Sequence, residues 1–383
     1  MLAIVSISAR SLIFVAKKTF KNLVALDVFG DIETIENSDH WFCIGKQKPY
    51  PKIDSNELLR KLKLASSMGC KAWIAGSGLE GNASLLFEAE KILPRYGMSI
   101  KTLESIYNPK FFFNVLRKFE IPFPEVVYAK KDILQNDDWL CKDLSSCGGM
   151  GIKKNNLIKK NTSGFFQKKI SGIPMSVSII SNGESSKLIG FCKLINFSFK
   201  DYPYLYSGII GPIRVSSLIT ETIMKYVSIL IREFKLVGFF GLDFIIKKNE
   251  IFVLEINPRP TVSLEILEKY HKNSLFELHC QSTIIRNQPS EKDKFSNLKL
   301  IKNKYKKLSG LKTVYALKNI MLNKKKITEI KKLSFTIDCP SISSNFSEGQ
   351  PICTVAANGI DENTLKFELE KKCLIVNKIL FEL

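Results

Sequence analysis

Three polar side chains occupy alternate positions of a segment that begins like a buried strand. The segment IFVLEINPRPT, residues 251–261, opens with four apolar residues and then places Glu255, Asn257 and Arg259 two positions apart. Side chains two residues apart share one face of a strand, so we expect these three on one face and Leu254 on the other. Such a face either binds a ligand or is a solvated face with ordinary charge pairs.

The preceding segment GLDFII supplies a second carboxylate and is joined to this strand by KKNE. If Lys247 pairs with Ile251 across a three-residue loop, Asp243 lies opposite Glu255, whereas a two-residue loop turns Asp243 away. Asn249 tolerates a left-handed backbone and favours the three-residue loop. Two carboxylates and an amide oxygen on one face suit Mg²⁺ or Mn²⁺, with positions left for phosphate oxygens.

A loop of small residues follows an earlier predicted strand, in CKDLSSCGGMGIKK. Lys142 stands at the strand end and offers a point charge for a phosphate. Glycines allow backbone N–H groups to approach phosphate oxygens closely. The small residues of this loop are Cys147, Gly148, Gly149 and Gly151. The spacing of a P-loop is absent, and a plain flexible hairpin is the other interpretation.

The first hundred residues alternate strand and helix patterns. This βαβαβ order predicts a parallel sheet covered by helices. The strands are expected at 2–7, 23–29 and 71–76, and the helices at 11–20 and 57–70. SISAR follows the first strand in place of G-x-G-x-x-G, which disfavours a dinucleotide site. Further helices are expected at 108–120 and 217–235, and a final small unit at about 311–380.

Composition narrows the class of protein. The 383 residues, 45% of them hydrophobic, suit two or three domains. Nine scattered cysteines without a Cys-x-x-Cys pair predict reduced thiols and no zinc site. With no signal or membrane segment recognised, we expect a cytoplasmic protein without a membrane partner. The net charge of +20 invites nucleic-acid binding, but lysines are spread along the chain, so a phosphate-rich substrate explains it as well.

Together these residues resemble the ATP-grasp superfamily. The resemblance lies in the order of Lys110, Lys142 with its glycine loop, Gln167, Asp243, Glu255, Asn257 and Arg259. A closer similarity is to predicted ATP-dependent carboligases related to biotin carboxylase, carried by SAR at 8–10, ALDVFGD at 25–31 and EINPRPTVSLE at 255–265. The resemblance implies an α/β protein, α+β in its ATP-binding part. Its predicted parts are an N-terminal parallel α/β domain (1–105), an ATP-grasp domain (106–285, divided at 195/196) and a small C-terminal α/β subdomain (286–383).

The resemblance also implies roles for single residues. Lys110 and Lys142 would hold the α- and β-phosphates of ATP, and the 147–151 loop would cover the β- and γ-phosphates. The backbone after Gln167, at Lys168, Lys169 and Ile170, would read the adenine edge. Asp243, Glu255 and Asn257 would hold the metal ions. Arg259 and Lys142 are the expected catalytic residues, Arg259 stabilising the acyl-phosphate and the tetrahedral state.

The implied reaction is an ATP-dependent ligation of a carboxylate to an amine through an acyl-phosphate, with release of ADP and phosphate. One alternative is carboxylation through carboxyphosphate, and another is a non-catalytic ATP-binding or nucleic-acid-binding protein. Biotin carboxylase has a glutamate base four residues after the arginine, where this chain has Ser263, and Glu265 lies two positions further on. This departure favours the carboxylate–amine ligase. The expected partners are the two small-molecule substrates, with a homodimer as a possible assembly. Further site candidates are Glu80, Asp27 and Asp31.

Overall fold

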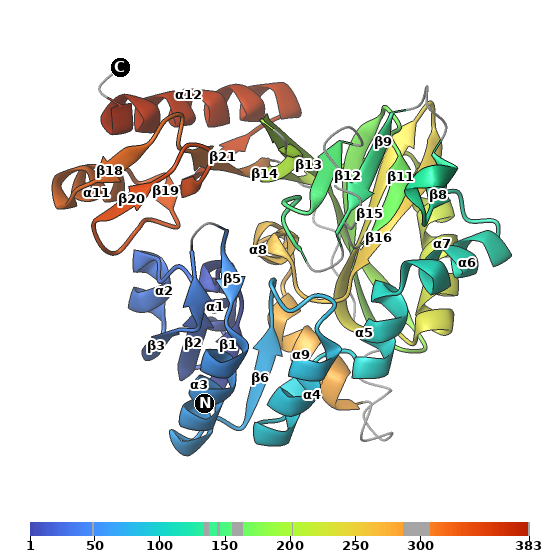
Figure 1. Ribbon diagram of the computed structural model, residues 1–383, viewed down its shortest axis with the longest axis horizontal. Helices are drawn as coiled ribbons and strands as arrows, with labels where there is room; N and C mark the ends of the chain where they lie inside the picture. Colours follow the sequence, from blue (N-terminus) through green and yellow to red (C-terminus); the bar gives the residue numbers. More distant parts are fainter. Residues whose placement is uncertain are drawn as a thin grey trace.

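The computed structural model describes residues 1–47, 50–133, 138–143, 146–154, 164–200, 202–285 and 307–381. In Figure 1 an N-terminal domain, the part that the sequence predicts to bind ATP (here called the ATP-binding part) and a C-terminal unit lie around the short helix α8 (Val262–Glu268). Across the described ranges, no helix is long and apolar enough to cross a membrane.

The N-terminal domain is built on a five-stranded parallel sheet in the order β3-β2-β1-β6-β7, which confirms the predicted arrangement. Its three central strands are largely buried, as is typical of a parallel sheet covered by helices. They are β1 (Leu2–Val5), β2 (Leu23–Asp27), β3 (His40–Cys43), β6 (Ala72–Ala75) and β7 (Arg95–Tyr96). The helices are α1 (Arg10–Ala16), α2 (Ile32–Asn37), α3 (Ser55–Ser67) and α4 (Ala83–Ile92), and a small hairpin joins β4 (Gly45–Lys46) to β5 (Lys52–Ile53).

A four-stranded sheet in the order β10-β9-β11-β8 carries the glycine loop. Its strands are β8 (Val126–Val127), β9 (Trp139–Lys142), β10 (Ile152–Lys154) and β11 (Phe165–Lys168). It follows the helices α5 (Ile100–Tyr107) and α6 (Pro109–Lys118), and a short 3-10 turn (Lys130–Asp132) precedes β9. The antiparallel pairing of β9 with β10 places the two ends of the loop beside each other.

An eight-stranded antiparallel sheet forms the other wall of the ATP-binding part and continues into the C-terminal unit, in the order β16-β15-β12-β13-β14-β17-β21-β19. Its first five strands in chain order are β12 (Ile173–Asn182), β13 (Ser186–Phe199), β14 (Tyr202–Ile213), β15 (Val237–Lys247) and β16 (Glu250–Asn257). The C-terminal strands are β17 (Leu308–Tyr315), β19 (Thr336–Ile337) and β21 (Pro351–Gly359). The predicted C-terminal unit therefore shares one sheet with the β15–β16 hairpin.

Helices cover both ends of this sheet. The C-terminal unit adds the hairpin of β18 (Ile320–Leu322) with β20 (Ser344–Phe346), and the helices α11 (Lys324–Lys331) and α12 (Glu362–Phe381). α7 (Ser217–Phe234) and α9 (Leu275–Ile285) pack in the ATP-binding part. The predicted boundary at 285/286 adjoins residues 286–306, which lie outside the described part of the chain.

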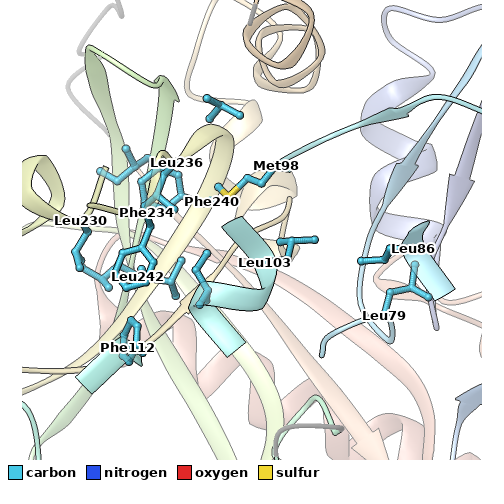
Figure 2. Packing of buried hydrophobic residues seen from close by; sticks show 14 of the residues in the cluster. Leu79, Leu86, Met98, Leu103, Phe112, Leu230, Phe234, Leu236, Phe240 and Leu242 are labelled. Carbon is cyan, nitrogen blue, oxygen red and sulfur yellow. The ribbon is translucent and has the colours of Figure 1, made fainter. Parts of the chain in front are cut away.

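One hydrophobic cluster joins the N-terminal domain to the ATP-binding part, and Figure 2 shows it from Leu79 to Phe112. Helix α6 illustrates how the sequence builds it. Asn108 caps the helix by accepting from the N–H of Phe111, and Pro109 fits the first turn because it needs no N–H partner there. Phe112 then packs against Phe234 of α7, with ring centroids 5.8 Å apart. Burying each such ring contributes about 1.5–3 kcal/mol, so these contacts fix the two parts together.

Candidate active site

The β15–β16 hairpin brings the predicted carboxylates together, but not by the predicted loop. Lys247 pairs with Glu250, so the loop has two residues, and the prediction of a three-residue loop is wrong. Lys248 and Asn249 both have positive φ, 49° and 68°, as the common two-residue hairpin turn requires. Asp243 nevertheless lies opposite Glu255, because the register shifts between Asp243 and the next residue. The predicted pairing of the two carboxylates is thus confirmed.

A β-bulge at Leu254 produces that shift. Phe244 pairs with Val253 and Asp243 with Glu255, so Leu254 is the extra residue of the longer strand. The expectation that Leu254 points away from the polar face is wrong, since it lines the same cavity as Glu255. A bulge breaks strict alternation and lets two consecutive side chains reach one side of the sheet.

Asp243, Glu255 and Asn257 form the group that we call the carboxylate platform. Asn257 Nδ2 donates to Asp243 Oδ2 at 3.0 Å. Burial and the neighbouring Glu255 together raise the pKa of Asp243 to about 7, against the opposing effect of a hydrogen bond from Ser176. Within the described ranges no three His, Cys, Asp or Glu residues gather as a metal site, so a cation here needs other oxygens, such as those of phosphate.

Lys142 lies at the end of β9, near the platform. Burial lowers the pKa of its ammonium group, and the negative charges of Glu255 and Asp243 oppose this shift. No ion pair joins either Lys142 or Glu255 to another described residue. A lone ammonium group facing two carboxylates leaves both signs of charge available to a ligand.

The glycine loop is docked on β14. The carbonyl of Gly148 accepts from the N–H of Tyr206 at 2.9 Å. Gly149 has φ +77°, and a Cβ at this position would lie 1.8 Å from the carbonyl oxygen of Tyr204. Only glycine allows this approach of two backbones. Burial raises the pKa of the Cys147 thiol to about 12, so this cysteine is unreactive.

The segment expected to read adenine lines the cavity on the β11 side. Gln167 is buried, and its Nε2 has no hydrogen-bond partner in the described part of the chain. The N–H groups of Lys168 and Lys169 donate to the carbonyls of Glu125 and Asp138. Adenine recognition here would therefore use carbonyl oxygens, the Gln167 amide or the backbone of Ile170, which also lines the cavity.

Arg259 and Lys110 differ in their relation to the site. Arg259 lines the cavity, and its Nε forms an ion pair with Glu80 Oε1 at 2.7 Å, which brings this residue of the N-terminal domain to the site. Lys110 is exposed on α6, with its Nζ 5.6 Å from the ring of Tyr128, and lies outside the cavity lining. The predicted phosphate contact of Lys110 stays a prediction.

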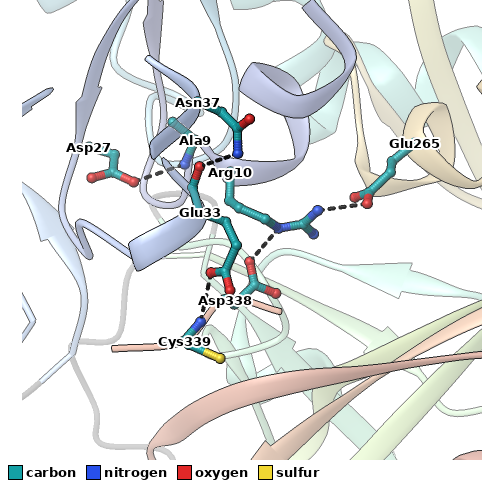
Figure 3. Close-up of polar contacts among 8 residues, drawn as sticks. All are labelled: Ala9, Arg10, Asp27, Glu33, Asn37, Glu265, Asp338 and Cys339. Carbon is teal, nitrogen blue, oxygen red and sulfur yellow. Dashed lines mark hydrogen bonds and ion pairs between the residues drawn. The ribbon is translucent and has the colours of Figure 1, made fainter. Parts of the chain in front are cut away.

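Asp27 and Glu265 hold the fold rather than a ligand. Asp27 accepts hydrogen bonds from the N–H groups of Ala9 and Gly30 and from Trp41 Nε1, at 3.0, 2.9 and 2.6 Å. Glu265 Oε1 bonds to Arg10 at 2.6 Å, as Figure 3 shows. Both residues lie outside the cavity lining.

Arg10, Glu265 and Asp338 form the Arg10 junction, where all three parts of the molecule meet (Figure 3). Arg10 is 5% exposed, and its Nε bonds to Asp338 Oδ1 at 2.6 Å. Burial raises the pKa of the nearby Asp31 well above its usual value, and Asp338 and Asp27 raise it further. Asp31 is therefore part of this structural cluster, apart from the cavity.

A cavity of about 1370 Å³ connects these features. Its lining includes the carboxylate platform, Lys142, the glycine loop and Arg259, together with residues of the N-terminal domain and the C-terminal unit. Ser263 also lines it, and its hydroxyl is hydrogen-bonded to Ser178 and Thr261, both at 2.7 Å. A serine held in this way offers no carboxylate base.

Comparison with known proteins identifies this architecture. Residues 108–263 match the family model of the ATP-grasp domain. The chain has the ATP-grasp fold. N5-carboxyaminoimidazole ribonucleotide synthetase, solved as an ADP complex, superposes with TM-score 0.66 at 15% identity, covering 98% of this chain and 96% of that one. Biotin carboxylase from Campylobacter jejuni gives TM-score 0.67 at 13% identity, covering 99% and 91%. L-amino acid ligase from Bacillus licheniformis gives 0.67 at 12%, covering 99% and 97%.

Curated relatives match only in part. An uncharacterized protein of Methanocaldococcus jannaschii is 28% identical over 159 residues, which cover 39% of this chain and 36% of that protein. The carbamoyl phosphate synthase large chain of Thermoplasma volcanium is 31% identical over 103 residues, covering 26% of this chain and 9% of that one. The ATP-grasp chain thus spans about a third or less of the curated relatives that it matches.

Two contributions to the site were missed by sequence reasoning. Ser176 is paired with Asp243 across β12 and β15 and bonds to its carboxylate, but an isolated serine in a strand gives no signal. The second is a set of aromatic residues on the β13–β14 hairpin that line the cavity. The run NFSFKDYPYLYSG, residues 196–208, is dense enough in aromatic residues that composition alone could have revealed it.

Proposed function

We propose that the chain is an ATP-dependent ligase that forms an acyl-phosphate from a carboxylate and transfers the acyl group to an amine, releasing ADP and phosphate. The observation that carries this proposal is the pairing of Asp243 with Glu255 across the β15–β16 hairpin, beside Lys142. Two adjacent carboxylates repel each other unless a cation neutralises them. The platform is therefore suited to hold Mg²⁺ against the phosphates of ATP.

The residues present fit both ATP and Mg²⁺. The unpartnered Nε2 of buried Gln167 offers a hydrogen bond at the expected adenine end. Asp243 and Glu255, with the Asn257 side-chain oxygen, supply the few hard oxygens that Mg²⁺ takes from proteins. When bound, Mg²⁺ would neutralise charge on the phosphate oxygens as the γ-phosphoryl group moves.

The chain's own groups would then act in turn. Lys142 would hold the phosphates by its charge, and the docked glycine loop would exclude water from them. The substrate carboxylate oxygen attacks the γ-phosphorus and ADP leaves, so that a mixed anhydride forms. The amine then attacks the acyl carbon and loses a proton, and phosphate leaves. Arg259, held in place by Glu80 at 2.7 Å, would stabilise the negative charge of both steps.

Carboxylation through carboxyphosphate is the second candidate, because a carboxylase is among the proteins that share the fold. Ser263 weighs against it, since its hydroxyl is occupied by Ser178 and Thr261. In that reaction bicarbonate would take the place of the organic carboxylate.

The test is turnover of MgATP with pooled carboxylates, using hydroxylamine in place of the amine. ADP release accompanied by hydroxamate is the expected result. Glu255→Gln should abolish both products, while Glu250→Gln is the matched control, because Glu250 is exposed on the same strand away from the cavity. ADP release with bicarbonate but no hydroxamate would replace the ligase by the carboxylase. Absence of ADP release with every pool would contradict both.

A further inference from the structure

The cavity is larger than a nucleotide site needs. A pocket for one small ligand typically measures about 300–1000 Å³, whereas this cavity measures about 1370 Å³. Beyond the glycine loop its walls come from the N-terminal domain, the β13–β14 hairpin and the C-terminal unit. We call this half the aromatic chamber, defined by Phe29, Tyr50, Phe199, Tyr202, Tyr206 and Tyr315.

The chamber is closed by aromatic contacts between separate parts of the chain. Tyr50 of the N-terminal domain and Tyr202 of β14 have ring centroids 5.8 Å apart at 61°, and their hydroxyls are hydrogen-bonded. The Tyr315 hydroxyl donates to the carbonyl of Tyr206, which ties β17 to β14. The ring of Tyr315 stacks on Phe197 at 4.9 Å and 15°. These rings are therefore held in place before a ligand arrives.

The charges around the chamber indicate what it does not accommodate. Among the described residues that line this half, the cation is Lys200, and Glu348 pairs with it at 2.7 Å. Arg10 lies buried outside the lining, and both of its carboxylate partners are on the protein. A phosphate group would require an available arginine or lysine. Among the described residues of the chamber, the one cation is thus already paired, which disfavours a phosphorylated substrate.

One polar atom of the chamber has no hydrogen-bond partner among the described residues. The hydroxyl of Tyr206 is buried and has no hydrogen-bond partner in the described part of the chain. Buried hydroxyls are normally hydrogen-bonded, so this atom suits a polar group on a ligand. Tyr206 also donates its backbone N–H to Gly148 of the glycine loop. The unpartnered hydroxyl therefore belongs to a residue that touches the loop over the phosphates.

We infer that the amine substrate carries a flat aromatic ring with a polar substituent and no phosphate group, and that its ring binds in the aromatic chamber. This inference rests on the proposed ligase function. Aromatic side chains bind a flat ring more strongly than a saturated ring of equal size, because offset and edge-to-face contacts add to burial.

The test compares matched amines at equilibrium, in the presence of MgADP. Benzylamine and cyclohexylmethylamine differ only in the aromaticity of the ring, and phosphoethanolamine supplies a phosphate. We expect benzylamine to bind about fivefold more tightly than its saturated partner. Tyr50→Leu and Tyr202→Leu should each reduce this preference to less than twofold. Phe87→Leu is the matched control, because Phe87 is 53% exposed on α4 and outside the cavity lining.

The outcomes separate the chamber from the reaction. Equal binding of the two rings, tighter binding of phosphoethanolamine, or a preference unchanged in both tyrosine variants would overturn the inference. Selective binding of benzylamine without hydroxamate formation would support the chamber and count against the ligase. Hydroxamate formation without any aromatic preference would support the ligase and overturn the chamber.

Discussion

The carboxylate platform and the Arg10 junction are both clusters of carboxylates around a cation, yet the charges are paired differently in the two clusters. At the junction Arg10 bonds to Glu265 and Asp338, both at 2.6 Å. At the platform Asp243 lies opposite Glu255, and Lys142 lies near them without forming an ion pair to another described residue. At the junction both carboxylates are bonded to a cation of the protein, while the platform keeps charges that a ligand can satisfy.

This difference suggests how to tell a ligand site from a structural cluster on one chain. A buried ion pair with both partners present holds segments together and leaves nothing for a ligand. Like charges held close together cost free energy in the empty protein, and a bound cation removes this cost. Loss of a residue should therefore affect stability at the junction and activity at the platform.

The largest expected effect is on activity at the platform. Glu255→Gln removes one of two charges that would neutralise a metal, and we expect ADP release to fall about 100- to 1000-fold. The melting temperature should change little, because Glu255 is exposed to the cavity and makes no ion pair in the described part of the chain. Steady-state ADP release and a melting curve measure both, with Glu250→Gln as control. A stability loss with full activity would reverse our assignment of the two clusters.

Arg10→Gln tests the opposite behaviour. It leaves Glu265 and Asp338 without their cation, and the free energy of unfolding should fall by about 3 kcal/mol. Urea unfolding measures the loss. Arg60→Gln is the matched control, because Arg60 is 62% exposed in its pair with Glu57 and should change stability by less than about 0.5 kcal/mol. The affinity for MgADP, measured by calorimetry on the folded variant, should stay within about twofold. A tenfold weaker affinity would make the junction part of the nucleotide site.

Gly149→Ala tests a part of the proposed ATP site that depends on backbone contact rather than charge. A Cβ at this position would lie 1.8 Å from the Tyr204 carbonyl oxygen, so the loop must undock from β14. We expect the KM for ATP to rise about tenfold, because the loop no longer covers the phosphates. Gly148→Ala is a control at the next position, where a Cβ meets no atom within 4 Å and φ is also positive, at +64°. Equal effects of both variants would attribute the change to backbone strain.

The smallest expected effect is a gain in stability on substitution of Asp31, opposite in sign to the loss expected for Arg10→Gln. The folded protein raises the pKa of Asp31, so the folded state holds this proton above the pH at which the unfolded chain releases it. Stability is therefore lost as pH rises from about 4 toward the folded pKa. Asp31→Asn should be more stable than the native chain at pH 7.5, and the difference should shrink toward pH 4. Urea unfolding at both pH values tests this, and a constant difference would exclude titration as its cause.

Much of the ATP-binding part could be predicted because its signals are local. Short segments of sequence suffice to indicate three features: the alternation along residues 251–257, the capping by Asn108 and the strand–helix order of the N-terminal domain. The register of the β15–β16 hairpin was harder to predict from the sequence. Lys248 is an unusual residue for a left-handed turn position, and the bulge at Leu254 leaves no trace in composition. The sequence predicted a loop that was one residue too long and a strict alternation that the bulge breaks. These two errors cancelled, so the predicted pairing of Asp243 with Glu255 was still correct.

Contacts between segments far apart in the chain could not be predicted from the sequence. Arg10 and Asp338 are 328 positions apart, and no sequence pattern near either residue indicates a contact with the other. The same holds for Glu80, whose turn after β6 reaches Arg259 only through the packing of two domains. Lys110 is a further case, since its place in the order of residues suggested a phosphate contact, whereas its Nζ lies 5.6 Å from the ring of Tyr128 and the contact stays a prediction. Order along the chain constrains the fold more tightly than it constrains a side chain.

The continuous sheet has a practical consequence for anyone who shortens this protein. β14 pairs with β17 through residues 208–211 and 309–312, so removing everything after residue 307 would expose the backbone of β14 as a new edge. Uncovered edge strands recruit other chains and aggregate. A fragment ending there would lose solubility, although it retains every residue of the carboxylate platform. The C-terminal unit therefore protects this edge in addition to forming a wall of the chamber.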